Sequence, residues 1–163
     1  MAVAGPVFLD TSVLLAGLIE LGDQSLAADR ILDDVASGAI ERPLTAWHCC
    51  LEFYSVATRL PAGLRLEPQT ARQLLVEEVL ARFDVHGLPI TAQRSFLESI
   101  ASQGVAGGRT YDAHIAEVAR LAGAAVVVSG NHRHFASLVR HGLRVLSPEE
   151  FVSLRDADPR RGD

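Results

Sequence analysis

Three carboxylates in this chain stand where an acid could do chemistry. Asp10 ends the apolar run VFL and is followed by two hydroxyls, Thr11 and Ser12. Glu52 is the single acid in the mostly apolar segment WHCCLEFYSVATRL, and Asp112 follows a glycine-rich loop. Carboxylate oxygens are the hard ligands that Mg²⁺ and Mn²⁺ prefer. If the three acids converge, they predict a divalent metal site.

Each acid also has a purely structural alternative. Asp10 could only cap the helix that follows it, and Asp112 could be an ordinary acid in a first helical turn, where the helix dipole favours a carboxylate. Glu52 could lie on an exposed stripe, or it could face a cleft where a cation neutralises it. His48 precedes Glu52 by about one helical turn, so a His–Glu metal pair and a histidine satisfied by the backbone are both open.

Short apolar strands that alternate with helices must position these acids. This alternation predicts an α/β fold, a three-layer α/β/α sandwich with a short parallel sheet. We expect one domain over residues 1–155 and a disordered tail at 156–163. The strands are expected at 7–9, 39–45, 85–90, 124–128 and 143–146, and the helices at 13–21, 25–37, 47–60, 68–83, 91–103, 110–122, 134–139 and 148–154.

Ligands bind outside the carboxyl ends of the strands in open α/β sheets, and two of the expected strands end in polar groups. Asp10 follows the strand at 7–9. The segment Ser129-Gly130-Asn131 follows the strand at 124–128, whose β-branched run is typical of a central parallel strand. The same edge of the sheet is therefore expected to carry both.

Local signals predict two helix caps and one sheet edge. Ser12 and Thr91 are expected to cap the helices that follow them. A glycine and a proline interrupt the strand at 85–90, which places it near an edge of the sheet.

Lysine is absent from the chain, and all fifteen of its Lys or Arg side chains are arginine. This excludes a P-loop, which needs its lysine on the phosphates, and a Schiff-base enzyme, which needs an amine. The two cysteines, Cys49 and Cys50, are adjacent and match no zinc spacing, so we expect buried free thiols in a reducing compartment. No membrane span or signal peptide is evident, which predicts a cytoplasmic protein.

Charge is distributed unevenly along the chain, whose formal net charge is −5. Residues 93–146 contain six arginines and only three acids, so the rest of the chain carries the acidic excess. The arginine-rich part could face phosphates. The alternative is a solvated surface on which the arginines cluster by chance.

Four segments of the chain resemble a known family. They are VFLDTSVLLA, LEFYSVATRL, TYDAHIAEVARLAGAAVVVSGNHRHF and LRVLSPEEF. In this order they closely resemble the PIN-domain family, and within it the VapC-type toxins of bacterial toxin–antitoxin pairs. The resemblance extends from about Val7 to Phe151.

The resemblance implies roles for particular residues. Asp10, Glu52 and Asp112 would be the metal-binding catalytic residues, with Mg²⁺ or Mn²⁺ as the cofactor. The segment from Ser129 to Asn131 would supply a further residue of the metal's ligand shell. Many relatives carry Asp where this chain has the neutral Asn131, so a second metal ion would be held less firmly than in those relatives.

The resemblance also implies an activity and partners. The activity would be that of a metal-dependent endoribonuclease that cleaves single-stranded or loop regions of RNA with a metal-activated water. Ser12 and Ser129 would orient the metal-binding carboxylates, and Arg109 and Arg133 are candidates for phosphate contacts. The expected partners are a cognate antitoxin, a second copy of the chain and the RNA substrate, with no membrane.

Two other functions remain open at this point. A phosphatase with Asp10 as its nucleophile is one, although such an enzyme usually has a second acid two residues later and a lysine, and this chain has Ser12 and no lysine. A PIN-like module that binds RNA without cleaving it is the other. Metal-dependent cleavage of RNA, lost on chelation, would separate the three functions.

Overall fold

The sheet is built around the buried run that precedes Asp10. The computed structural model describes residues 5–157 and contains a parallel sheet in the order β3-β2-β1-β4-β5. Each strand has three or four residues, and the central strand β1 is wholly buried, as expected of a strand covered on both faces. The strands are β1 (Val7–Leu9), β2 (Pro43–Ala46), β3 (Asp84–His86), β4 (Val126–Val128) and β5 (Arg144–Leu146).

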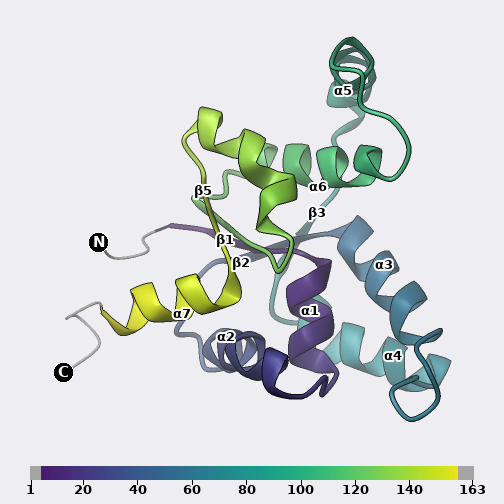
Figure 1. Cartoon of the computed structure of the whole chain (residues 1–163), viewed down its shortest axis with the longest axis vertical. Coiled ribbons are helices and arrows are strands. Elements are labelled where there is room, and N and C mark those ends of the chain that lie inside the picture. Colours follow the sequence, from purple (N-terminus) through teal and green to yellow (C-terminus); the bar gives the residue numbers. More distant parts are fainter. Residues whose placement is uncertain (1–4, 158–163) are drawn as a thin grey trace.

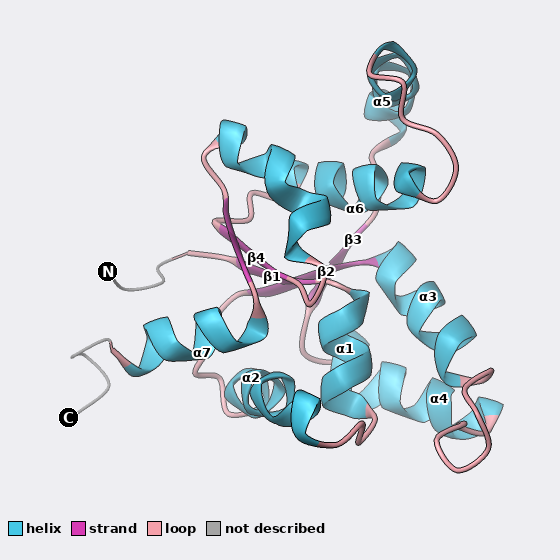
Figure 2. Ribbon diagram, in the orientation of Figure 1, coloured by secondary structure: helices cyan, strands magenta, loops and turns pink. Residues whose placement is uncertain are grey.

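Helices cover both faces of this sheet and complete the three-layer α/β/α sandwich predicted from the sequence. In Figures 1 and 2, α5, α6 and η3 lie above the sheet, and α1, α2, α4 and α7 lie below it. The helical elements are α1 (Thr11–Leu18), η1 (Asp23–Ser25), α2 (Leu26–Ala36), α3 (Trp47–Ala57), α4 (Pro68–Leu74), the π-helical turn η2 (Leu75–Leu80), α5 (Ile90–Ser102), α6 (Arg109–Leu121), the 3₁₀ helix η3 (His132–His141) and α7 (Pro148–Asp156).

All five predicted strands are present, with β3 at an edge of the sheet and β4 in its interior. The strand predicted at 85–90 ends at His86, because Pro89 caps α5 and Ile90 begins it, and β4 begins at Val126 instead of residue 124. β2 begins later than expected, at Pro43, because the chain bends at residues 39–42; the Arg42 carbonyl still accepts the backbone N–H of Val7 at 3.0 Å. No helix within residues 5–157 is long and apolar enough to cross a membrane.

Three local predictions are wrong. The N-cap of α1 is Asp10 and not Ser12, because the Asp10 carboxylate accepts the first free backbone N–H groups of the helix. Pro89 and not Thr91 precedes α5, whose first residue is Ile90. Asp156 does not begin a tail, because it is the last residue of α7 and pairs with Arg30. The part of the predicted tail at 158–163 lies outside the described residues.

The two cysteines confirm the prediction of buried free thiols. Cys49 and Cys50 are free and buried in α3, as part of the hydrophobic core. Burial raises the pKa of the Cys49 thiol to about 12, which keeps it protonated and chemically quiet at neutral pH.

The absence of a side chain at Gly17 allows helices α1 and α2 to pack closely. A Cβ at this position would lie 2.6 Å from Leu32 Cδ1 and 3.0 Å from the Ala28 carbonyl oxygen. Because the carbonyl cannot move without shifting α2, we expect Gly17→Ala to lower the free energy of unfolding by about 1–3 kcal/mol in a urea titration. Gly87→Ala is the control, since a Cβ there meets nothing within 4 Å. Equal stability of the two variants would contradict this packing.

Candidate active site at the carboxyl edge of the sheet

Asp10 is held rigidly between two strand ends. It follows β1, and Ser129 follows the neighbouring strand β4, whose register pairs Leu9 with Val128. This pairing brings the Ser129 hydroxyl to 2.6 Å from Asp10 Oδ2. The other carboxylate oxygen, Oδ1, accepts from the Ser12 hydroxyl at 2.5 Å and from the backbone N–H groups of Ser12 and Val13 at 3.0 and 3.3 Å. The hydroxyls of Ser12 and Ser129, which the family resemblance predicts to orient this carboxylate, therefore both contact it.

The charge of Asp10 is buried and has no cationic partner among the described residues. Asp10 is only 5% exposed, and none of the ion pairs within residues 5–157 involves it. Burial raises the pKa of this carboxyl group, and the hydrogen bonds from Ser12, Ser129 and Val13 oppose that rise. Oδ2 accepts a single hydrogen bond among the described residues, so it keeps a lone pair for a further ligand.

Glu52 lies beside Asp10 and is exposed. The Thr11 hydroxyl donates to Glu52 Oε2 at 2.5 Å, and Thr11 is the residue that follows Asp10. The contact joins the first turn of α1 to the middle of α3. Glu52 is thus exposed, as the first of its two sequence alternatives predicted, and its carboxylate contacts the residue that follows Asp10.

The Asp112 carboxylate contacts the side chain of His134, which comes from another helical element. His134 Nδ1 lies 3.0 Å from Asp112 Oδ2, with 56% of the His134 side chain and 34% of the Asp112 side chain exposed. Asp112 is in the first turn of α6, and His134 is in η3. Sequence reasoning missed His134 as a site residue, although the run His-Arg-His directly after a polar strand end was an available signal.

A closed ring of contacts joins the three acids. Asp10 contacts Ser129, whose hydroxyl also accepts the backbone N–H of Asn131 at 2.9 Å, and Asn131 opens η3. η3 contacts Asp112 through His134, and α6 then contacts α3 through ring stacking between its first turn and His48. Glu52 on α3 closes the ring through Thr11.

The ring links the three acids only through other residues, and they do not form a ready metal cage. Among residues 5–157, no three His, Cys, Asp or Glu side chains are grouped closely enough to hold an ion. The Asn131 side chain is exposed, and its backbone N–H is the group that contacts Ser129. Asp10 is fixed, whereas Glu52 and Asp112 are more exposed and can change rotamer.

The arginines predicted to contact phosphate share one cavity with Asp112. This cavity, which we call the arginine basin, has a volume of about 430 Å³. Arg109 comes from the start of α6, and Arg133 and Arg140 come from η3. Arg140 was not singled out from the sequence as a phosphate contact. The full lining is Gln103, Val105, Arg109, Asp112, Ala113, Ala116, Arg133, His134, Ser137 and Arg140.

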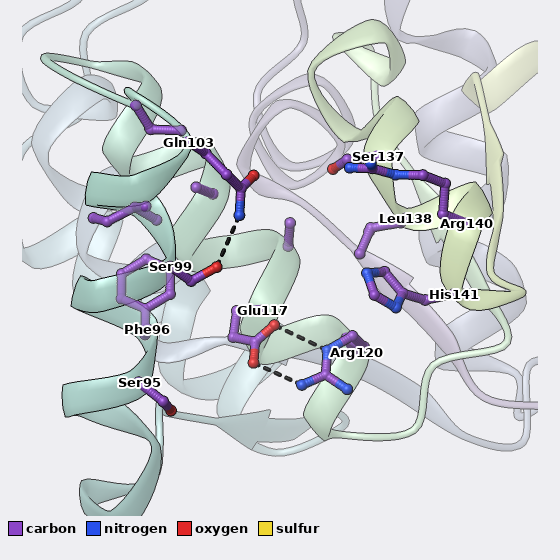
Figure 3. A pocket seen from close by; sticks show the side chains of 14 residues that line it. Ser95, Phe96, Ser99, Gln103, Glu117, Arg120, Ser137, Leu138, Arg140 and His141 are labelled. Atoms are coloured by element: carbon purple, nitrogen blue, oxygen red, sulfur yellow. Dashed lines mark hydrogen bonds and ion pairs between the residues drawn. The ribbon is translucent and has the colours of Figure 1, made fainter.

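A second cavity, of about 460 Å³, continues the arginine basin between α5, α6 and η3. Figure 3 shows Gln103 and Ser99 on one wall, Ser137, Arg140 and His141 on the other, and Glu117 with Arg120 below them. The two cavities share Gln103, Ser137 and Arg140, so they form one groove. The Arg120 guanidinium binds Glu117 and lowers the pKa of its carboxyl group. This part of the groove contains none of the three candidate acids.

Comparisons with known proteins agree with this fold. A model of the PIN domain family matches residues 6–133. Ribonuclease VapC40 of Mycobacterium tuberculosis is 34% identical over 115 residues, which cover 71% of this chain and 79% of the relative. Ribonuclease VapC27 of the same organism is 34% identical over 112 residues, which cover 68% and 74%.

Solved structures show the same fold at lower identity. Mycobacterium tuberculosis VapC20, a sarcin–ricin loop cleaving toxin, has a TM-score of 0.61 at 15% identity over 80% of this chain and 94% of that one. FitAcB from Neisseria gonorrhoeae has a TM-score of 0.58 at 17% identity over 88% of this chain and 98% of that one.

The parallel sheet and the acids at its carboxyl edge define an α/β protein of the PIN type. The chain belongs to the PIN-domain family, and within it to the VapC-type ribonucleases. The resemblance noted from its sequence is thereby confirmed.

Proposed function

We propose that this chain is a Mg²⁺- or Mn²⁺-dependent endoribonuclease, the toxin of a toxin–antitoxin pair, and that it cleaves single-stranded or loop regions of RNA. The observation that carries the proposal is the buried Asp10 carboxylate, oriented by Ser12 and Ser129 and without a cation among the described residues. A buried charge is costly unless a counter-charge compensates it. A divalent ion would supply that charge.

The residues present fit such an ion. All three acids offer oxygen ligands, and Asp10 Oδ2 keeps a lone pair. No three such side chains within residues 5–157 are grouped closely enough to hold an ion, but Glu52 and Asp112 are held by one hydroxyl and one histidine, contacts that can be exchanged for a metal ligand. Asn131 would add a neutral oxygen. Its lack of charge favours one firmly bound ion over two.

The protein's own groups would then position the substrate. Bound at this edge, the ion would supply Lewis acidity and lower the pKa of a water molecule. Ser12 and Ser129 hold the Asp10 carboxylate in one orientation, as outer partners of metal ligands do. Arg109, Arg133 and Arg140 in the arginine basin bind the phosphates on either side of the cleaved bond.

The direct test is cleavage of a short single-stranded RNA by the purified chain, with a duplex of the same sequence as the comparison. We expect cleavage of the single strand in Mg²⁺ or Mn²⁺, none in EDTA, and recovery when the ion is restored. RNA that is bound but left intact at saturating metal would instead identify a non-catalytic RNA-binding module. No observation in the structure favours a phosphatase, since the hydroxyl of Ser12, where a second acid would stand, is bonded to Asp10.

The arginine basin gives a second prediction. Arg109→Ala and Arg133→Ala should each weaken RNA binding and reduce the slope of log K against log salt by about one, because each removes one phosphate contact. Arg42→Ala is the matched control, since Arg42 is exposed before the amino end of β2, at the opposite edge of the sheet. Binding would be measured by fluorescence anisotropy. If the slopes are unchanged in both basin variants, these arginines belong to an ordinary solvated surface and do not contact phosphate.

An exposed apolar surface on α3, α4 and η2 supports a protein partner. Trp47, Leu51 and Tyr54 on α3 lie with Val76 and Leu80 of η2 around a small cavity of about 240 Å³, and all five are at least 38% exposed. Contiguous apolar surface of this kind marks protein interfaces. We assign it to the cognate antitoxin or to a second copy of the chain in a toxin–antitoxin assembly. Co-expression with the neighbouring short reading frame tests this: a product that does not co-purify would contradict the toxin assignment.

A further inference from the structure

Four aromatic rings beside Asp112 form a continuous chain of contacts, which we call the stack although only one of the contacts is face to face. Tyr111 lies against His48 with ring centroids 5.3 Å apart and an angle of 19° between the planes. His114 contacts His48 edge to face at 5.4 Å, and Phe96 contacts His114 in the same way at 5.9 Å. The rings come from α3, α5 and α6, so they also connect these three helices.

Tyr111 is the exposed end of this stack. It is 58% exposed although one face of its ring packs on His48, so most of the remaining ring surface is open to solvent. The packing fixes the orientation of the ring before any ligand arrives. A rigid aromatic ring offers a large contact area at a small cost in conformational entropy.

Tyr111 and the arginine basin lie on different faces of α6. Residues of an α-helix follow one another at about 100° around its axis. Arg109, Asp112, Ala113 and Ala116 line the basin and form one face, while Tyr111 and His114 form the opposite face. Asp112 lies between Arg109 and Tyr111 around the first turn. A candidate metal ligand is thus flanked by a cation on one side and by a flat ring on the other.

We propose that Tyr111, supported by His48, stacks on an unpaired base of the RNA next to the cleaved phosphate, and that it is a positioning residue for cleavage. The inference rests on the proposed function and deepens it. An RNA single strand presents a charged backbone and flat bases together, and this first turn offers a partner for each. Stacking on an aromatic ring is a main mode by which proteins bind unpaired bases. The arginine basin on the other side of Asp112 supplies the cations that the RNA backbone needs.

The first experiment detects stacking without requiring cleavage. It uses the Asp10→Asn variant, so that the RNA stays intact, and a series of short single-stranded RNAs that carry one 2-aminopurine at successive positions. The fluorescence of this base falls when it stacks. We expect quenching on binding at one or two adjacent positions, lost in Asp10→Asn/Tyr111→Ala and retained in Asp10→Asn/Tyr111→Phe. Leu26→Ala, in the same background, is the control for loss of an exposed apolar side chain away from the site.

The second experiment measures positioning in the active protein. Tyr111→Ala should lower kcat/KM by about 5- to 150-fold, the range expected for one lost base stack, with no change in the Mn²⁺ concentration that gives half-maximal activity. An abasic site at the quenched position should slow the wild type by a similar factor and should have no further effect on Tyr111→Ala. Tyr111→Phe should behave as the wild type. A purely structural role for Tyr111 would lower activity equally on intact and abasic RNA.

The outcomes separate this inference from the proposed function. Metal-dependent cleavage together with quenching and abasic effects that persist in Tyr111→Ala would overturn the stacking role alone. Tyr111-dependent quenching without any cleavage by the wild type would overturn the nuclease and keep the stacking. No binding of RNA would overturn both. A change in oligomeric mass in Tyr111→Ala, with RNA binding unaltered, would show that the ring contacts protein, and would also overturn the inference.

Discussion

Asp10→Asn is expected to lower RNA cleavage by at least about 100-fold, because even the outer partners of metal ligands cost about 10- to 100-fold when they are lost. The amide retains one oxygen that can accept from the backbone N–H groups of Ser12 and Val13, so the cap of α1 survives. What disappears is the negative charge that would hold the ion. Single-turnover cleavage at saturating Mn²⁺ measures the loss, and activity within a few fold of the wild type would rule out Asp10 as a ligand.

The same variant makes a prediction about stability. Burial raises the pKa of Asp10 in the metal-free protein. A carboxyl group with a raised folded pKa contributes stability that is present below its unfolded pKa and is lost as pH rises through the folded value. At neutral pH in EDTA, Asp10 therefore contributes less to the stability of the wild type than it does in acid.

Thermal unfolding checks this prediction. In EDTA, Asp10→Asn should unfold at a temperature no lower than that of the wild type. Mn²⁺ should raise the Tm of the wild type and leave that of the variant unchanged. Glu41→Gln, an exposed acid before β2, should respond to Mn²⁺ as the wild type does. A variant that is less stable in EDTA and still stabilised by Mn²⁺ would show that the Asp10 charge serves the fold and not a metal.

The sheet and the position of Asp10 were predictable because both depend on local patterns. A short apolar run that ends in a polar residue specifies a buried strand and its carboxyl end. The parallel register then brings Ser129 to Asp10 without further information. The N-cap of α1 was not predictable in the same way. Asp10 and Ser12 are both good caps, and only the extended backbone at Asp10 decides between them.

The contacts between side chains of different elements across the site could not be predicted from the sequence. His134 reaches Asp112 only because η3 folds back over α6 after β4, and no spacing along the chain reports that return. The stack of His48 and Tyr111 likewise depends on how α3 and α6 are placed by different strands. Sequence patterns thus predict which residues stand at strand ends. The packing of helices decides which of them meet.

The strongest test of a shared ion is the double variant Asp10→Asn/Asp112→Asn. Asp112→Asn alone should also lower cleavage by about 100-fold. The Asp112 side chain is partly exposed and lies outside the core, so damage to the core does not account for that loss. If both acids bind one ion, the first substitution already removes the ion's contribution to cleavage. The second substitution then causes no further loss of activity. The double variant should therefore be about as active as the weaker single variant, instead of about 10,000-fold below the wild type.

A second double variant is the control, and it shows that the assay can detect losses of cleavage larger than those of either single variant. Arg133 lines the basin and would act on a phosphate, independently of the ion's ligands. Asp112→Asn/Arg133→Ala should thus lose the product of its two single effects, measured in the same single-turnover assay. Multiplication of the losses in Asp10→Asn/Asp112→Asn as well would mean that the two carboxylates work separately. In that case the ring of contacts from Asp10 through Ser129 and η3 to Asp112 would join two distinct functional groups, and a single metal centre at this edge of the sheet would be wrong.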